Sequence, residues 1–145
     1  MEIDDITGVI VDSAVKIHRD LGSSLFESVY ELALAAVLQR RGLRVARQRP
    51  IGLSYEGVDC ALAFRADLVV EGCVLVELKV VDRLTRTHRT QLLTYLRLAG
   101  LPVGLVLNFG AEVMKDGIKR VVNSLPSSAS SPLRINRPNR GRSEP

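Results

Sequence analysis

The sequence predicts an α/β fold in which a mixed β-sheet is flanked by helices. The first indication is helical character in three segments. Apolar residues recur three and four positions apart in Asp4–Leu21, an apolar run within about Leu25–Arg41 suggests a helix buried on most sides, and Thr85–Ala99 has an apolar stripe. The second is a series of short segments rich in Val and Leu between these helices, as is typical of strands. The third is Val103–Asn108, a nearly apolar strand of the kind found in sheets that are covered on both faces.

Glycines mark the ends of several predicted elements. Gly42 follows the second helix and Gly100 follows the third, where helices commonly end. The pair Glu56-Gly57 predicts the turn of a hairpin. Besides Val103–Asn108, the predicted strands are Leu43–Gln48, Ile51–Tyr55, Val58–Leu62, Phe64–Val70, Val74–Val80 and Ile118–Val122.

The composition favours one globular domain followed by a tail. The 145 residues are 46% hydrophobic with a mean hydropathy of +0.13, which suits a single core. The net charge is +4, but residues 126–145 contain four arginines and one glutamate, a net of +3 that leaves +1 for residues 1–125. We therefore expect a nearly neutral domain over residues 1–125 and a disordered tail, rich in Arg, Pro and Ser, over residues 126–145.

Nothing in the sequence predicts a membrane protein or a secreted one. No apolar run approaches the roughly 18 residues of a membrane span, and the acidic start at Met1 lacks the basic and apolar regions of a signal peptide. We therefore expect a cytoplasmic protein. Cys60 and Cys73 have no metal-binding spacing, so we expect both to be reduced and structural.

The most informative segment is the hairpin predicted on either side of Gly72. Its charged residues outside the turn all occupy odd positions, and they are Arg65, Asp67, Glu77 and Lys79. A two-residue turn would set Asp67 and Glu77 on opposite faces, whereas a three-residue loop or a bulge at Gly72 brings them to a common face. Because shared chemistry requires a common face, we predict a loop of odd length.

Two neighbouring carboxylates repel each other unless one takes up a proton or a cation binds between them. Mg²⁺ prefers one or two carboxylates with water and phosphate oxygens, and the main-chain carbonyl of Leu78 would add a neutral ligand. Such an ion polarises a phosphoryl oxygen and activates water, and Lys79 would orient that water or neutralise developing charge. From spacing alone, a cross-strand ion pair of Lys79 with Asp67 or Glu77 on a solvated face is an equal alternative.

Four segments of the chain together resemble the GxxExxY family of the PD-(D/E)XK nuclease superfamily. The resemblance covers about Ile6–Val122, with two departures: Ser24 replaces the glycine that names the family, and Ala66 replaces the proline before the first acid. Neither departure removes a group that does chemistry. The four segments are Ser24–Tyr30, Phe64–Asp67, Val76–Lys79 and Gln91–Tyr95.

This resemblance implies a restriction-endonuclease-like fold and an enzyme, a Mg²⁺-dependent nuclease in which Mn²⁺ can substitute. The implied reaction is hydrolysis of phosphodiester bonds by metal-activated water, with DNA rather than RNA as substrate. It implies that Asp67, Glu77 and Glu27 bind the metal and that Lys79 is the catalytic lysine.

The remaining site residues concern the substrate. Gln91 and Tyr95 match the QxxxY element of the RecB-like and lambda-exonuclease-like branch, whose residues orient the lysine or contact DNA, and residues four apart share a helix face. Arg65 shares a strand face with Asp67, and Arg86 opens the third helix, so both are candidate phosphate contacts.

Alternatives remain open for these residues and for the function. Glu27 also fits a capping box with Ser24 at the start of the second helix, and Gln91 and Tyr95 also fit a plain polar edge of the third. The same fold would also serve as a non-catalytic module that binds nucleic acid or protein, or as a subunit of a larger nuclease or defence complex. The oligomeric state stays open between a homodimer and a complex with a partner protein, because a lone small nuclease domain often dimerises to cut two strands.

Overall fold

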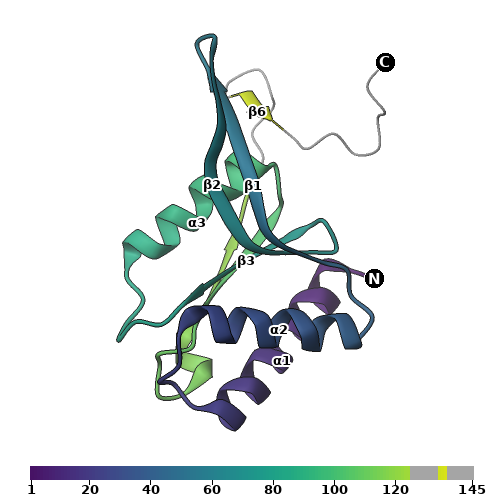
Figure 1. The fold of residues 1–145 in the computed structure, drawn as a ribbon, viewed down its shortest axis with the longest axis vertical. Coiled ribbons are helices and arrows are strands. Elements are labelled where there is room, and N and C mark those ends of the chain that lie inside the picture. Colours follow the sequence, from purple (N-terminus) through teal and green to yellow (C-terminus); the bar gives the residue numbers. More distant parts are fainter. Residues whose placement is uncertain (125–133, 137–145) are drawn as a thin grey trace.

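The computed structural model describes residues 1–124 and 134–136, and it has an α/β architecture with a mixed sheet between helices (Figure 1). The sheet has the strand order β5-β4-β3-β2-β1-β6, in which only β3 and β4 are parallel. The elements are α1 (Ile3–Leu21), α2 (Glu27–Arg40), β1 (Val45–Tyr55), β2 (Val58–Val70), β3 (Val74–Lys79), α3 (Arg86–Ala99), β4 (Val103–Asn108), the 3-10 turn η1 (Met114–Gly117), β5 (Ile118–Val122) and β6 (Arg134–Asn136).

Helices cover both faces of the sheet, as the nearly apolar β4 predicts (Figure 1). On one face α1 and α2 pack against the strands through residues such as Ile10 and Leu34. On the other face α3 packs through Leu92 and Leu96. The crossover from β3 through α3 to the parallel strand β4 is the common way to join parallel neighbours, and it places the end of β3 between the two helical layers.

The prediction was wrong to divide two long strands, because each of two pairs of predicted strands forms one continuous strand. The predicted strands that end at Gln48 and begin at Ile51 are both part of β1, and the two predicted around Ala63 are both part of β2. The antiparallel ladder continues past Pro50, and a bulge between Ile51 and Leu53 absorbs the mismatch. The resulting hairpin extends beyond the rest of the sheet (Figure 1).

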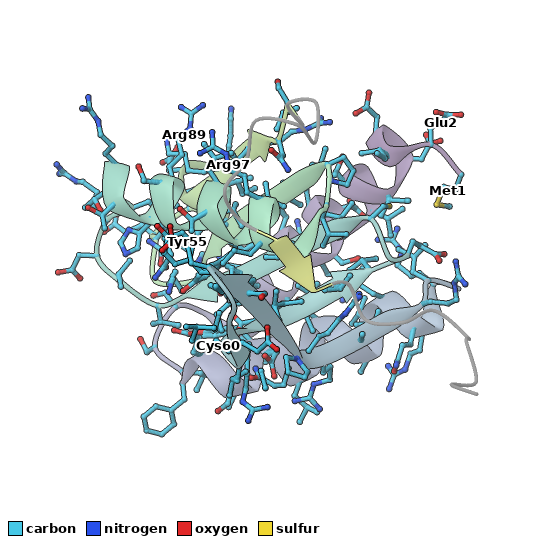
Figure 2. The ribbon with its side chains drawn as sticks, turned by 90° about the horizontal axis from the view of Figure 1, so that it is seen from above. Met1, Glu2, Tyr55, Cys60, Arg89 and Arg97 are labelled. Carbon is cyan, nitrogen blue, oxygen red and sulfur yellow. The ribbon has the colours of Figure 1, made fainter. Side chains whose placement is uncertain are left out.

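The tip of this long hairpin is exposed. Tyr55 and Cys60 lie at this end of the molecule (Figure 2). Arg89 and Arg97 lie on the outer side of α3, on a different part of the surface (Figure 2). These two arginines are thus available to solvent rather than packed against the sheet.

The loop between β2 and β3 has three residues, so the prediction of an odd-length loop is confirmed. Val70 pairs directly with Val74, and the N–H of Cys73 donates to the carbonyl of Val70 at 3.1 Å. Glu71 and Gly72 adopt positive φ values of 53° and 65°, the sign of φ that both central residues have in a type I′ turn, and Cys73 is the third residue of the loop. In this register, directly paired residues of β2 and β3 have their side chains on the same face of the sheet.

The start of α2 differs from the capping box considered for it. The N-cap is Phe26 and Glu27 is the first helical residue, with no side-chain cap hydrogen bond. The preceding loop is held instead by Tyr30, whose hydroxyl donates to the carbonyl of Gly22 at 2.5 Å and accepts from the N–H of Leu25 at 3.2 Å. The carboxylate of Glu27 is therefore left for other interactions.

The predicted tail, residues 126–145, lies outside the described residues except for β6, which pairs with Gly52–Ser54 of β1. Within the described residues, no helix has the length and apolar character needed to cross a membrane.

Candidate active site

Asp67 and Glu77 lie on neighbouring antiparallel strands. The pairing of Leu68 with Val76, continued by one residue, sets Asp67 opposite Glu77. The N–H of Leu78 donates to Oδ2 of Asp67 at 2.9 Å, and the N–H of Asp67 donates to Oε1 of Glu77 at 3.3 Å. Both carboxylates are thus held by main-chain donors at the same place on the β2–β3 pair.

Burial makes this pair of acids electrostatically costly. The side chain of Glu77 is 6% exposed, and burial, followed by the charge of Asp67, raises its pKa to about 8. Burial also raises the pKa of Asp67, against the hydrogen bond from Leu78, which lowers it. Near neutral pH the site therefore tends to hold a proton or to bind a cation.

Glu27 and Lys79 belong to the same electrostatic cluster. Burial raises the pKa of Glu27, the charge of Asp67 raises it further, and the charge of Lys79 lowers it. The charge of Lys79 also lowers the pKa of Glu77. The adjacent strands β2 and β3 and the first turn of α2 therefore bring three acids and one lysine close enough to affect one another's charge.

Two further polar residues of this cluster were missed by sequence reasoning, Glu31 and Gln48. Glu31 is buried, and it accepts hydrogen bonds from Nη2 of Arg47 at 3.0 Å and from the side-chain amide of Gln48. The amide of Gln48 also donates to Oδ1 of Asp67 at 3.4 Å. The four-residue spacing of Glu27 and Glu31, which sets both on one helix face, was a signal that could have identified Glu31.

Gln48 points into the cluster because of its backbone. It has a φ of 49° within β1, where it stands opposite Asp67 and outside the regular ladder, whose pairs on either side are Arg47 with Leu68 and Arg49 with Ala66. A left-handed conformation is unfavourable for a residue other than Gly, Asn or Asp. Neither the residue type of Gln48 nor the residues next to it in the sequence predicted this conformation.

An open pocket of about 410 Å³ adjoins these residues. It lies between the start of α2 and the strands β1 and β2. Its lining residues are Phe26, Glu27, Ser28, Glu31, Gln48 and Asp67. The pocket thus gives solvent and small ligands access to the acids from the α2 side.

The side chain of Asn108 holds the main chain just after Lys79 in place. Asn108 is 1% exposed at the end of β4; its Oδ1 accepts from the N–H of Val81 at 3.0 Å and its Nδ2 donates to the carbonyl of Val81 at 2.8 Å. The N–H of Phe109 donates to the carbonyl of Lys79 at 2.8 Å. These bonds hold the chain immediately after Lys79 against β4.

Of the residues predicted to contact the substrate or to assist from α3, Tyr95 interacts electrostatically with the acids, whereas the others are exposed. Tyr95 stacks on Phe64 with ring centroids 3.8 Å apart, and its pKa is raised by burial and by the charges of Glu77 and Asp67. Gln91 is exposed one turn earlier on α3, and no hydrogen bond joins it to the acids. Arg65 and Arg86 are exposed, and among residues 1–124 and 134–136 neither forms an ion pair.

The donor set fits a hard divalent cation. Carboxylate oxygens are the ligands that Mg²⁺ prefers, and it needs only one or two of them because it keeps several waters. Such a charge would relieve the repulsion between the carboxylates of the buried Glu77 and the half-buried Asp67. In the part of the chain that the structure describes, no three His, Cys, Asp or Glu side chains stand close enough to hold one ion together, so the fit rests on this pair.

Comparison with known protein families identifies the superfamily of the chain. A family model described as the PD-(D/E)XK nuclease superfamily matches residues 4–121, which extend from α1 into β5 and include every acid of the cluster. No curated protein and no solved structure matches the chain.

Proposed function

The chain belongs to the PD-(D/E)XK nuclease superfamily, and we propose that it is a nuclease that hydrolyses DNA phosphodiester bonds with Mg²⁺, or with Mn²⁺ in its place. Within the superfamily we assign it to the GxxExxY family of the RecB-like and lambda-exonuclease-like branch. The observation that carries the proposal is the cross-strand pair of the buried Glu77 and the half-buried Asp67, with Lys79 two residues further along β3.

The metal would be held by the carboxylates of Asp67 and Glu77 and by the main-chain carbonyl of Leu78. Glu27, which forms no three-carboxylate cluster with this pair in the described residues, would position the ion from the start of α2. Bound there, the ion would polarise a phosphoryl oxygen of the substrate and activate a water molecule. The main-chain N–H groups that hold Asp67 and Glu77 fix these carboxylates before any ligand arrives, which limits the reorganisation that binding requires.

Lys79 would neutralise the charge that develops on the phosphoryl oxygens and orient the attacking water. Gln91 would assist in positioning the lysine, and Tyr95 would contact the substrate from α3. Arg65 and Arg86 would bind backbone phosphates, because exposed arginines supply affinity that is independent of sequence.

The test is cleavage of labelled DNA by the purified chain with Mg²⁺ or Mn²⁺. Asp67→Asn and Lys79→Ala should each lower the rate at least about a hundredfold, the loss typical of removing a transition-state charge contact. Asp59→Asn and Lys115→Ala, at an exposed acid and an exposed lysine outside the cluster, are the matched controls and should cleave normally. Cleavage that survives both site substitutions would refute the assignment.

Calorimetry separates this function from that of a binding module. The wild type should bind Mg²⁺ or Mn²⁺, and Asp67→Asn should bind it more weakly. If the wild type binds neither metal while it still binds DNA or a protein, the chain is better described as a non-catalytic module or as a subunit of a larger complex.

A further inference from the structure

Phe26 is the most exposed large hydrophobic side chain among the described residues, with 84% of its surface accessible. It is the N-cap of α2 and directly precedes Glu27. Leu25 and Val29, each 38% exposed, add apolar surface beside it. A phenyl ring this exposed at the start of a well-formed helix buries little of its apolar surface in the free protein.

The position of this ring connects it with the acids. Phe26 lines the same pocket of about 410 Å³ as Glu27, Glu31 and Asp67. The pocket has room for a nucleobase and its sugar. A nucleotide next to the phosphate that Asp67 and Glu77 face would therefore meet the ring of Phe26.

Charge does not explain how a nucleotide would stay in this pocket. Among the described residues that line it, three are acids and none is a lysine or an arginine. The chain has a net charge of +4, of which +3 lies in residues 126–145. Stacking of a base on an aromatic ring is the interaction that such a pocket offers, because every base has a π-face and stacking needs no charge.

We propose that Phe26 stacks on an unpaired nucleobase next to the scissile phosphate, so that the substrate class is single-stranded DNA, strand ends or other unstacked nucleotides. A base inside a continuous duplex is already stacked on both sides and would have to leave the helix first. The inference rests on the proposed nuclease function and specifies the substrate of the same site.

The first test uses fluorescence and does not depend on cleavage. The chain contains no tryptophan, so Phe26→Trp introduces a single reporter at the pocket. In a Lys79→Ala background with Mg²⁺, a short thymidine oligonucleotide should quench this tryptophan and bind about tenfold more tightly than an abasic oligomer of equal length. Val122→Trp, 60% exposed on β5, is the matched control and should respond to neither.

The second test uses kinetics of the chain with Lys79 intact. Phe26→Ala should raise KM for single-stranded DNA about tenfold and change kcat little, because a ground-state stacking contact is lost. Phe26→Tyr should restore the KM of the wild type. Because the ring is exposed, thermal melting should be unchanged in all variants.

Several results would overturn the inference. Equal quenching by the thymidine and abasic oligomers would do so, as would an unchanged KM for Phe26→Ala in an active enzyme. A concentration-dependent change in tryptophan emission without DNA would instead identify Phe26 as a contact between copies of the chain. Absence of any cleavage by the wild type would refute the proposed nuclease function, while the fluorescence comparison would still decide whether a base stacks.

Discussion

At the scale of single residues, the burial of Glu77 lowers the free energy of unfolding when its carboxyl is charged. It is buried beside Asp67, and its pKa lies at about 8 instead of the ordinary 4.5. An acid whose pKa is raised on folding contributes stability that is fully present below its unfolded pKa and is lost as the pH rises through the folded pKa. The stability of the metal-free protein that depends on Glu77 should therefore fall between about pH 4.5 and about pH 8.

Glu77→Gln should remove this dependence. We expect the free energies of unfolding of variant and wild type to differ little near pH 5 and the variant to be more stable by roughly 2–4 kcal/mol above about pH 8. Urea denaturation over this pH range measures the difference. Mg²⁺ should stabilise the wild type at about pH 8 and the variant much less, and a difference between variant and wild type that stays constant with pH would contradict the prediction.

Gln48 combines a left-handed backbone with hydrogen bonds to two acids. Its bond to Asp67 lowers the pKa of that carboxyl. Gln48→Gly keeps the backbone favourable and removes the amide, so the pKa of Asp67 should rise further, as a carboxyl-resolved NMR titration would detect. Gln48→Ala should raise the same pKa but cost about 1 kcal/mol more stability, because alanine carries the strain of a positive φ. Equal stability of the two variants would show that the backbone is not strained.

At the scale of elements, the α1–α2 loop positions the N-terminus of α2, and Tyr30 holds it. The ring is fully buried and stacks on Phe109 with centroids 4.4 Å apart, while its hydroxyl bonds both Gly22 and Leu25. The conformation of the loop therefore depends on the side chain of Tyr30, and the positions of Phe26 and Glu27 depend on the conformation of the loop.

Tyr30→Phe should keep the ring stacking and lose only the hydroxyl. Two main-chain groups would lose their partner, at a cost of about 1–2 kcal/mol in the free energy of unfolding. Calorimetric melting measures this loss, and metal binding should weaken with it because Glu27 is less well placed. Tyr55→Phe, at the exposed hairpin tip, is the matched control and should melt like the wild type.

Helices and turns could be predicted where a single pattern, such as an apolar stripe or a required common face, extends over the whole segment. The apolar stripes of α1 and α3 and the apolar run of α2 located these helices within about two residues, and the need for Asp67 and Glu77 to meet predicted the odd-length loop. The two long strands were predicted in pieces, although the antiparallel ladder of β1 and β2 continues past Pro50. Gln48 was missed because its role comes from a backbone conformation that its residue type does not favour.

At the scale of the whole molecule, the distribution of charge separates catalysis from general attraction to nucleic acid. The acids of the site lie in residues 1–125, whose net charge is only +1, whereas residues 126–145 carry +3. Affinity for DNA that depends on salt should therefore come in large part from the C-terminal arginines, and cleavage from the folded part.

Removal of residues 137–145 deletes Arg137, Arg140, Arg142 and Glu144 and leaves β6 in place. Each phosphate contact contributes about 0.7 to the salt slope of binding to single strands, so three arginines account for a slope of about 2. We expect the truncated chain to bind DNA with a slope lower by up to about this amount and to cleave saturating DNA at the rate of the full chain. A chain with the three arginines replaced by lysine should keep the original slope, because it keeps the charge. An unchanged slope after truncation would place the phosphate contacts on the folded part, where Arg65 and Arg86 are the exposed candidates.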